Sequence, residues 1–194
     1  IEWKSNPPLS PHFGGSWEAA VKSTKALLQK TFGNQSYTSW ELSTMFTKIE
    51  CILNSRPLQP TSDSPEDIET LTPGHFLVGH PLNAILEPSY DDVPENRLSR
   101  WQLIRERVQY FWKRWREEYV RSLQVRDKWT KETPSLKVGD LVLISDARTS
   151  PTQWPMARVV CIHPGQDNVV CVVTLKTSQG IYKRPSLKLI PLLV

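Results

Sequence analysis

Residues 98–123, LSRWQLIRERVQYFWKRWREEYVRSL, decide how the chain is organised. Its apolar residues recur in steps of three and four, and they are Leu98, Trp101, Ile104, Val108, Phe111, Trp112, Trp115, Tyr119 and Leu123. That spacing places them along one side of an α-helix. We therefore predict one long helix that begins near Asn96 and ends near Trp129. It separates two parts of the chain whose sequence patterns differ.

The part before the long helix shows helical spacing and turn signals. A loop is expected over 6–15, because this run contains three prolines and two glycines. A first helix is predicted from about Ser16 to Lys30, and Gly33 ends it. Thr38 and Glu41 have the spacing of a capping box, which predicts a second helix from Thr38 that Pro57 ends. A short turn of helix is expected within 71–79, with irregular segments at 62–69 and 80–96.

The part after the long helix contains five short β-branched runs, at 140–145, 156–163, 169–176, 181–184 and 187–190. Residues 165–168 and 178–180 give the clearest hairpin turns. Five short strands in so little sequence predict a small closed barrel, because an open sheet would leave unprotected edges. The predicted fold class is therefore α+β.

Charge is divided unevenly along the chain. Residues 1–96 hold 6 Lys and Arg against 12 Asp and Glu, whereas residues 97–194 hold 18 against 8. An asymmetry of this size favours a polyanion as the partner of the second half. A basic half that only keeps the protein soluble is an equally good interpretation of the charge alone.

Several classes of protein are disfavoured by composition. No run approaches the roughly 20 apolar residues of a membrane span, so no membrane partner is expected, and no signal peptide is found. The three cysteines cannot all pair, which favours a reducing compartment. Cys161 and Cys171 alternate with valines and are expected to be small core residues. His163 precedes Pro164 at the end of a predicted strand, where a role in a turn is favoured over a role as a metal ligand.

Glu18 is the candidate for chemistry. It lies in the first turn of the first predicted helix, after Gly14 and Gly15, and Lys22 and Lys25 follow at the fourth and seventh positions on the same expected face. Such a carboxylate could hold a metal ion while the lysines contact nucleic-acid phosphates. One carboxylate is not a Mg²⁺ site, however. The pattern alone favours a carboxylate that complements the helix dipole and pairs with Lys22.

A resemblance to a known family favours the metal-binding role of Glu18 instead. The run from Trp3 to Pro8, WKSNPP, and on through Pro11 to Lys22, PHFGGSWEAAVK, resembles the third catalytic segment of integrases from BEL/Pao-type retrotransposons. The similarity continues, in order, through blocks at 52–58, 71–79, 97–102, 111–115, 138–144, 154–159 and 183–189. These blocks span essentially the whole chain.

The resemblance implies three parts. Residues 1–80 would be the C-terminal part of an RNase H-like catalytic core, 81–133 a loop and a long basic helical linker, and 134–194 an SH3-like DNA-binding barrel. It also implies a centre of two Asp and one Glu that binds Mg²⁺ or Mn²⁺, with Glu18 as the third ligand. The two Asp are expected upstream of this chain, which alone should be inactive.

In the full-length enzyme, released from a polyprotein, the implied activity is metal-dependent processing of DNA 3′ ends and strand transfer during DNA integration. The implied partners are the DNA ends of the element, the target DNA and further copies of the enzyme in a homo-oligomer. The nucleus is the expected location, with a cytoplasmic particle as an earlier one.

Basic residues are the candidate DNA contacts. Lys22 and Lys25 match positions that face the DNA end in related integrases. Phosphate contacts are also predicted for Arg100, Arg107, Lys113, Arg114 and Arg121 in the long helix, and for Arg158, Lys183, Arg184 and Lys188 in the barrel. Aromatic rings can stack on unpaired bases. Helical spacing nevertheless favours a core position for Trp101, Trp112, Trp115 and Trp129.

Two other functions stay open. A non-catalytic nucleic-acid or chromatin-binding module, from a domesticated or degenerate element, would use the same helix and barrel. A reader of methylated histone tails would need an aromatic cage. The strand region offers only Trp154 and Tyr182 for such a cage, so this function ranks last.

Overall fold

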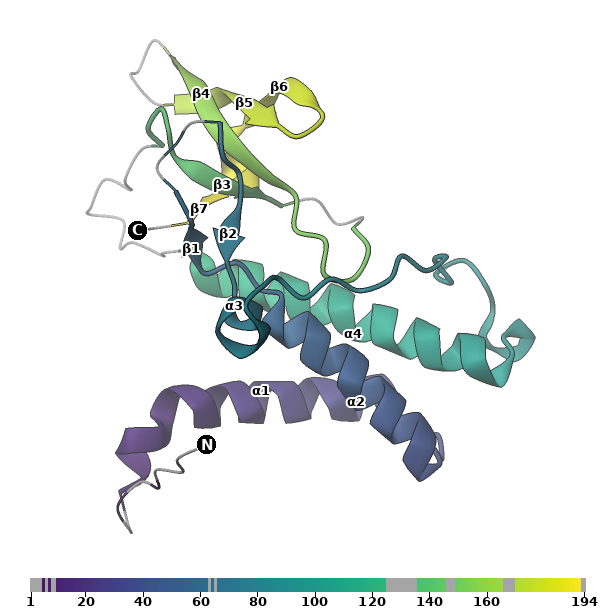
Figure 1. The fold of residues 1–194 in the computed structure, drawn as a ribbon. Helices are drawn as coiled ribbons and strands as arrows, with labels where there is room; N and C mark the ends of the chain where they lie inside the picture. Colours follow the sequence, from purple (N-terminus) through teal and green to yellow (C-terminus); the bar gives the residue numbers. More distant parts are fainter. Residues whose placement is uncertain are drawn as a thin grey trace.

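The computed structural model describes residues 5, 7, 10–62, 64, 66–124, 136–145, 149–165 and 170–192. The longer helices α1, α2 and α4 lie together at one end, and a five-stranded antiparallel sheet lies at the other (Figure 1). A two-stranded ribbon lies between them. The fold is therefore mixed α and β, as the sequence predicts. None of the described helices is long and apolar enough to cross a membrane.

The first two long helices follow the local sequence signals. Helix α1 (Gly15–Phe32) comes after a short 3-10 turn, η1 (Pro11–Gly14), and Gly33 ends it with a positive φ of 56°. Helix α2 (Ser39–Asn54) begins at the predicted capping box. The side chain of Thr38 accepts from the Glu41 N–H, and the Glu41 carboxylate accepts from the Thr38 N–H. Both predicted helices are confirmed.

Helix α4 (Arg100–Leu123) follows a second 3-10 turn, η2 (Glu95–Arg97), and Ser99 and Gln102 form its capping box. It ends at Leu123, because Gln124 has an extended backbone with a ψ of 111°. The predicted end near Trp129 lies outside the described residues, as does the predicted break at Pro134.

One apolar core joins the three long helices. Leu27 of α1, Met45 of α2, and Phe111 and Trp112 of α4 are buried in the same cluster. Helix α4 is thus a core element as well as a connection. Trp112 and Trp115 confirm the predicted core positions, whereas Trp101 is 46% exposed and Trp129 lies outside the described residues.

A small unit lies between the helices and the sheet. Strands β1 (Gln59–Pro60) and β2 (Thr70–Leu71) pair in an antiparallel ribbon that the sequence patterns did not predict. Helix α3 (Pro73–Val78) follows, and Gly79 ends it with a φ of 82°, as expected. The connection over 80–96 is largely irregular, again as expected.

All five predicted strands are present. They are β3 (Leu141–Ile144), β4 (Met156–Pro164), β5 (Val170–Thr177), β6 (Gly180–Pro185) and β7 (Leu189–Pro191). The last strand begins later than predicted, because Ser186–Lys188 form a 3-10 turn, η3. The turn expected at 165–168 falls mostly outside the described residues, but β4 and β5 pair as an antiparallel hairpin.

The predicted closed barrel is wrong, because the sheet stays open. Its strand order is β6-β5-β4-β3-β7, so β6 and β7 form the two edges and do not pair. Apolar residues of β3 and β7, including Leu141, Leu143 and Ile190, pack against Val120 of α4. The helix therefore covers apolar residues near the β7 edge, whereas the β6 edge stays exposed.

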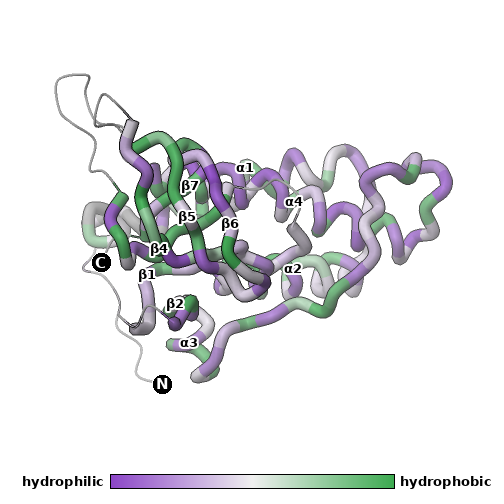
Figure 2. The backbone as a smooth tube through the Cα atoms, turned by 90° about the horizontal axis from the view of Figure 1, so that it is seen from above, coloured by the Kyte–Doolittle hydropathy of each residue, from purple (hydrophilic) through white to green (hydrophobic). Residues whose placement is uncertain are grey.

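Both faces of the sheet carry apolar side chains. Val142, Val159 and Leu175 share a second core cluster on the face opposite Leu141 and Leu143. In Figure 2 the strands carry much of the hydrophobic colour, whereas α1 and α4 are largely hydrophilic with single hydrophobic positions. This is the pattern of a two-sided sheet next to amphipathic helices.

The predicted core positions of Cys161 and Cys171 are wrong. Both cysteines are exposed. Register shifts between Val159 and Cys161, and again at the end of β4, interrupt the alternation on which the core prediction depended. His163 lies at the end of β4, as predicted, but its Nε2 is 2.8 Å from Thr174 Oγ1 of the neighbouring strand and it has no role in a turn.

Candidate nucleic-acid interface

The first candidate surface lies on α1. Glu18, Lys22 and Lys25 line one open hollow of about 480 Å³, so the helix presents all three on the face that their spacing predicts. Both lysines are exposed. No ion pair joins Glu18 to Lys22 in this described helix, so the structure lacks the pairing expected from the simpler interpretation. We call Lys22 and Lys25 the α1 basic pair.

Glu18 does not make a metal centre with the rest of the described chain. Across the described ranges, no group of three or more His, Cys, Asp or Glu side chains could hold a metal ion. A single carboxylate does not hold Mg²⁺, which needs further oxygen ligands. The described residues therefore do not fit the implied ion by themselves, and Glu18 supplies at most one of its ligands.

The second candidate surface lies at the open edge of the sheet. Lys183 and Arg184 of β6 and Lys188 of η3 are exposed, and none of them forms an ion pair with another described residue. All six residues of β6 are exposed. We call Lys183, Arg184 and Lys188 the β6 basic edge. These cations are exposed, so an external anion can reach them.

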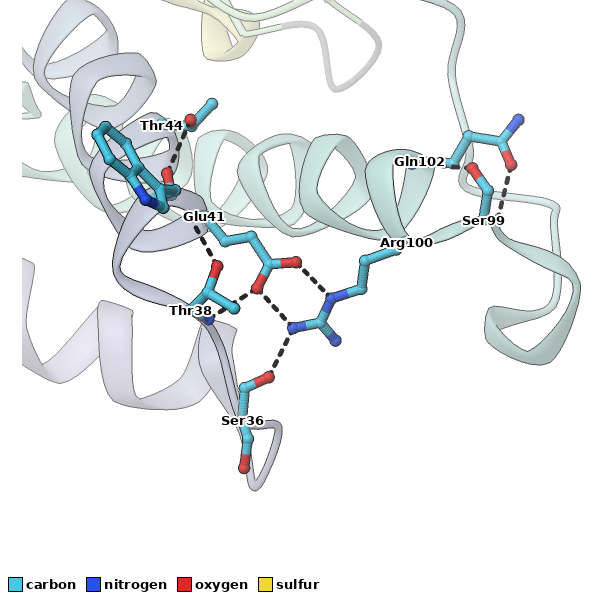
Figure 3. Close-up of polar contacts among 8 residues, drawn as sticks. Ser36, Thr38, Glu41, Thr44, Ser99, Arg100 and Gln102 are labelled. Atoms are coloured by element: carbon cyan, nitrogen blue, oxygen red, sulfur yellow. Dashed lines mark hydrogen bonds and ion pairs between the residues drawn. The ribbon is translucent and has the colours of Figure 1, made fainter.

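Arg100, in contrast, is paired within the protein (Figure 3). Its Nε donates to Glu41 Oε1 at 2.6 Å, and its Nη2 donates to Glu41 Oε2 at 2.8 Å and to the Ser36 carbonyl at 2.6 Å. The Arg100 hydrogen bond lowers the pKa of Glu41 to about 2, with help from the backbone N–H of Thr38. Arg100 therefore joins the start of α4 to the start of α2 and is a poor candidate for phosphate contact.

Two other predicted contacts are also paired with acids. Arg107 Nη2 lies 2.6 Å from Glu95 Oε1, and Lys113 forms an ion pair with Asp91. Both acids belong to the 80–96 connection or its end, so these pairs attach that connection to α4. Three of the five predicted DNA contacts in the long helix are therefore paired with acids of the protein itself.

Arg114 and Arg121 remain at the surface of α4. The Arg114 guanidinium lies 5.0 Å from the centre of the Tyr110 ring. Arg121 is 70% exposed and has only a long contact of 3.6 Å with Glu117. Exposed pairs of this kind contribute little to stability, so both side chains could exchange them for phosphates.

Arg158 is not placed for the DNA contact that its sequence position predicted. Its side chain is buried, with 4% of the residue exposed. The guanidinium donates to the carbonyls of Asp67, Gly139 and Ser62 at 2.7–3.0 Å. Arg158 thereby attaches the 61–69 loop to the sheet, and it has no free donor surface for DNA.

A cavity between the two ends of the molecule was not predicted. Its volume is about 970 Å³, and its walls come from 68–83, 149–156 and 175–184, with Ser55 and Ile144. Trp154 and Tyr182, noted in the sequence as an incomplete aromatic cage, both line it. These two aromatic residues were the only feature of the sequence that pointed to a binding site here. The other wall residues come from segments that are distant in the sequence.

Comparisons with known proteins give one match. Residues 99–192 match the model of a family of unknown function, DUF5641. No curated protein and no solved structure matches the chain. The matched range begins at the N-cap of α4 and ends just after β7, so it contains the long helix together with the whole five-stranded sheet.

Proposed function

We propose that this chain is a DNA-binding part of an integrase of the BEL/Pao retrotransposon type. The observation in its favour is the presence of two groups of exposed, unpaired cations, the α1 basic pair and the β6 basic edge. Exposed Lys and Arg side chains bind phosphates mainly by releasing counterions, with little regard to sequence. Such binding suits an enzyme that inserts DNA at many targets.

The same proposal gives Glu18 a role in a longer protein. It would be one of three carboxylate ligands of Mg²⁺ or Mn²⁺ in the full-length enzyme, which would process the ends of the element and join them to target DNA. A homo-oligomer working in the nucleus belongs to this proposal as well. The shared hollow of Glu18, Lys22 and Lys25 supports it, because a carboxylate beside two lysines can lie close to a bound phosphate.

A second candidate is a non-catalytic nucleic-acid or chromatin-binding module. It is favoured by a difference between the basic residues and the acidic residues of this chain. The cations of the β6 basic edge are exposed and form no ion pair with other described residues, whereas the described acids do not form a metal centre.

The salt dependence of DNA binding tests the property that both candidates share, which is contact between the exposed cations and DNA phosphates. We would measure the affinity for a blunt duplex of mixed sequence across a range of salt concentrations. Each lost phosphate contact should flatten the plot of log affinity against log salt by about 0.9. The double variant Lys183→Ala/Lys188→Ala should therefore flatten it by about 1.8, and Lys22→Ala/Lys25→Ala by a similar amount.

The control is Arg97→Ala/Lys137→Ala, which removes the same charge from exposed residues outside both groups. It should leave the slope nearly unchanged. Equal flattening in all three double variants would show that net charge alone governs binding. Failure of the unmodified chain to bind the duplex would refute DNA binding altogether.

A further inference from the structure

Residues of β3, β4, β5 and β6 line the cavity, together with residues from the first half of the chain. Tyr182 and Arg184 are two residues apart on the edge strand β6, so their side chains leave the strand on the same face. Both line the cavity. The opposite wall comes from the 149–156 segment and from residues that follow β1 in the first half of the chain. The cavity therefore adjoins the β6 basic edge, which shares Arg184 with it.

The ring of Tyr182 is held in a fixed position by contacts with the turn before it. Its hydroxyl donates to the Gln179 carbonyl at 3.2 Å. Gly180 has a φ of 135°, and a Cβ at that position would lie 3.6–3.8 Å from atoms of the Tyr182 side chain, so the ring lies against the turn. The residue is still 45% exposed. An exposed ring that is fixed in place loses little freedom when a planar group stacks on it.

The opposite wall is also fixed. Thr152 has a φ of 66°, an unfavourable conformation for a residue with a Cβ, and its hydroxyl accepts from the Ala84 N–H at 2.9 Å. Trp154 packs edge-on against Trp112, with ring centres 4.9 Å apart, and donates to Ser55 Oγ at 3.2 Å. Strained backbone persists where the surroundings impose it, often at binding sites. The cavity is thus preformed.

The chemistry of the walls matches a nucleotide. They combine a planar ring at Tyr182, a guanidinium at Arg184, and hydrogen-bonding groups such as the Gln179 amide and the Thr70 hydroxyl. A ring binds a base by stacking, a guanidinium binds phosphate, and amides and hydroxyls bind the edges of a base. A volume of about 970 Å³ lies within the range of ligand sites.

We propose that this cavity binds an unpaired nucleotide at the end of a DNA strand whose duplex lies along the β6 basic edge. This inference rests on the proposed DNA-binding function. A base within a duplex is already stacked and paired, so only an unpaired base is free to lie on Tyr182. Arg184 is the cation of the β6 basic edge that lines the cavity and can contact the phosphate of that nucleotide. Lys183 and Lys188 lie outside the cavity lining and can contact phosphates further along the DNA.

An extended peptide added to the β6 edge is the competing occupant. The strand carries two features that hinder strand addition. Pro185 has no N–H to donate, and Lys183 places a charge on the edge. The exposed ring and the adjacent guanidinium also have no use in main-chain pairing. The observations therefore favour the nucleotide.

The test compares duplexes of one sequence that are blunt or carry a short 5′ or 3′ overhang, with 2-aminopurine as the unpaired base. The chain should bind at least one overhang duplex about 5- to 150-fold more tightly than the blunt one, the range expected for stacking of one base. Stacking should also quench the 2-aminopurine fluorescence. Tyr182→Ala should remove the preference and the quenching but leave the affinity for blunt DNA unchanged.

Two further variants control for changes in the fold. Tyr182→Phe keeps the ring and should keep the preference, and Leu187→Ala, at a residue 90% exposed on the same edge, should have no effect. If blunt and overhang duplexes bind equally, or if the preference survives Tyr182→Ala, the inference is wrong while DNA binding stands. If neither duplex binds, the proposed function fails and the inference fails with it.

Discussion

Arg100 and Glu41 join two helix starts that are 59 residues apart in the sequence (Figure 3). Glu41 is the third residue of α2 and part of its capping box, whereas Arg100 is the first residue of α4. Both carboxylate oxygens accept from the guanidinium, a geometry that fixes orientation as well as distance. The pair therefore sets how α4 begins relative to α2.

This pair should make stability depend on acid pH. The pKa of Glu41 falls from 4.5 to about 2 in the folded chain, so its contribution is complete above pH 4.5 and is lost as the pH falls toward 2. Glu41→Gln keeps the capping side chain but removes the charge. Its urea unfolding midpoint should therefore fall less steeply than that of the unmodified chain between pH 4.5 and 2. Glu117→Gln, in an exposed pair, should follow the unmodified chain, and identical profiles for all three proteins would contradict the prediction.

Replacing Arg158 should destabilise the protein. Arg158→Lys removes the planar group that donates to three carbonyls, and it leaves buried acceptors without partners. Loss of such charge-assisted hydrogen bonds should lower the free energy of unfolding by about 2–3 kcal/mol. Arg184→Lys, at an exposed position, should change it by less than about 0.5 kcal/mol. Urea unfolding measures both values, and equal effects would show that Arg158 is not a structural residue.

Two tryptophans of α4 should differ sharply. Trp112 is 1% exposed at the centre of the helical core, and its Nε1 donates to the Thr149 carbonyl at 2.9 Å. Trp112→Ala should lower the free energy of unfolding by about 3–5 kcal/mol. Trp101 is 46% exposed, and Trp101→Ala should cost about 1 kcal/mol or less. A larger loss for Trp101 than for Trp112 in urea unfolding would contradict the described packing of α4.

The three cysteines should react with a thiol reagent at two different rates. Cys161 and Cys171 are exposed, so two thiols per folded chain should react rapidly. Burial raises the pKa of Cys51, and the neighbouring Glu50 adds to the effect, so less reactive thiolate is present. Single Cys→Ser variants assign each phase. A slow phase assigned to Cys161 or Cys171 would restore the core positions that their alternation with valines predicts.

Local sequence determined most of the elements. Thr38 and Glu41 mark the start of α2 because a capping box involves residues only three positions apart. Glu18, Lys22 and Lys25 share one face because helical geometry places positions i, i+4 and i+7 together. The five strands follow from short β-branched runs and turn residues in the same way. The capping box and the helix face are complete within a few residues, whereas the pairing of β3 with β7 joins segments that are distant in the sequence.

Tertiary structure decided what many of those residues do. Arg158 and Arg184 are both cations on β-strands, yet one is buried against the Asp67 carbonyl, 91 residues away, and the other is exposed beside a cavity. The sheet stays open, and α4 packs against apolar residues of β3 and β7. The sequence by itself set the elements and the supply of charge. Only packing between distant segments determined which charges pair inside the protein and which remain for a ligand, because a charge is neutralised by its neighbours in space.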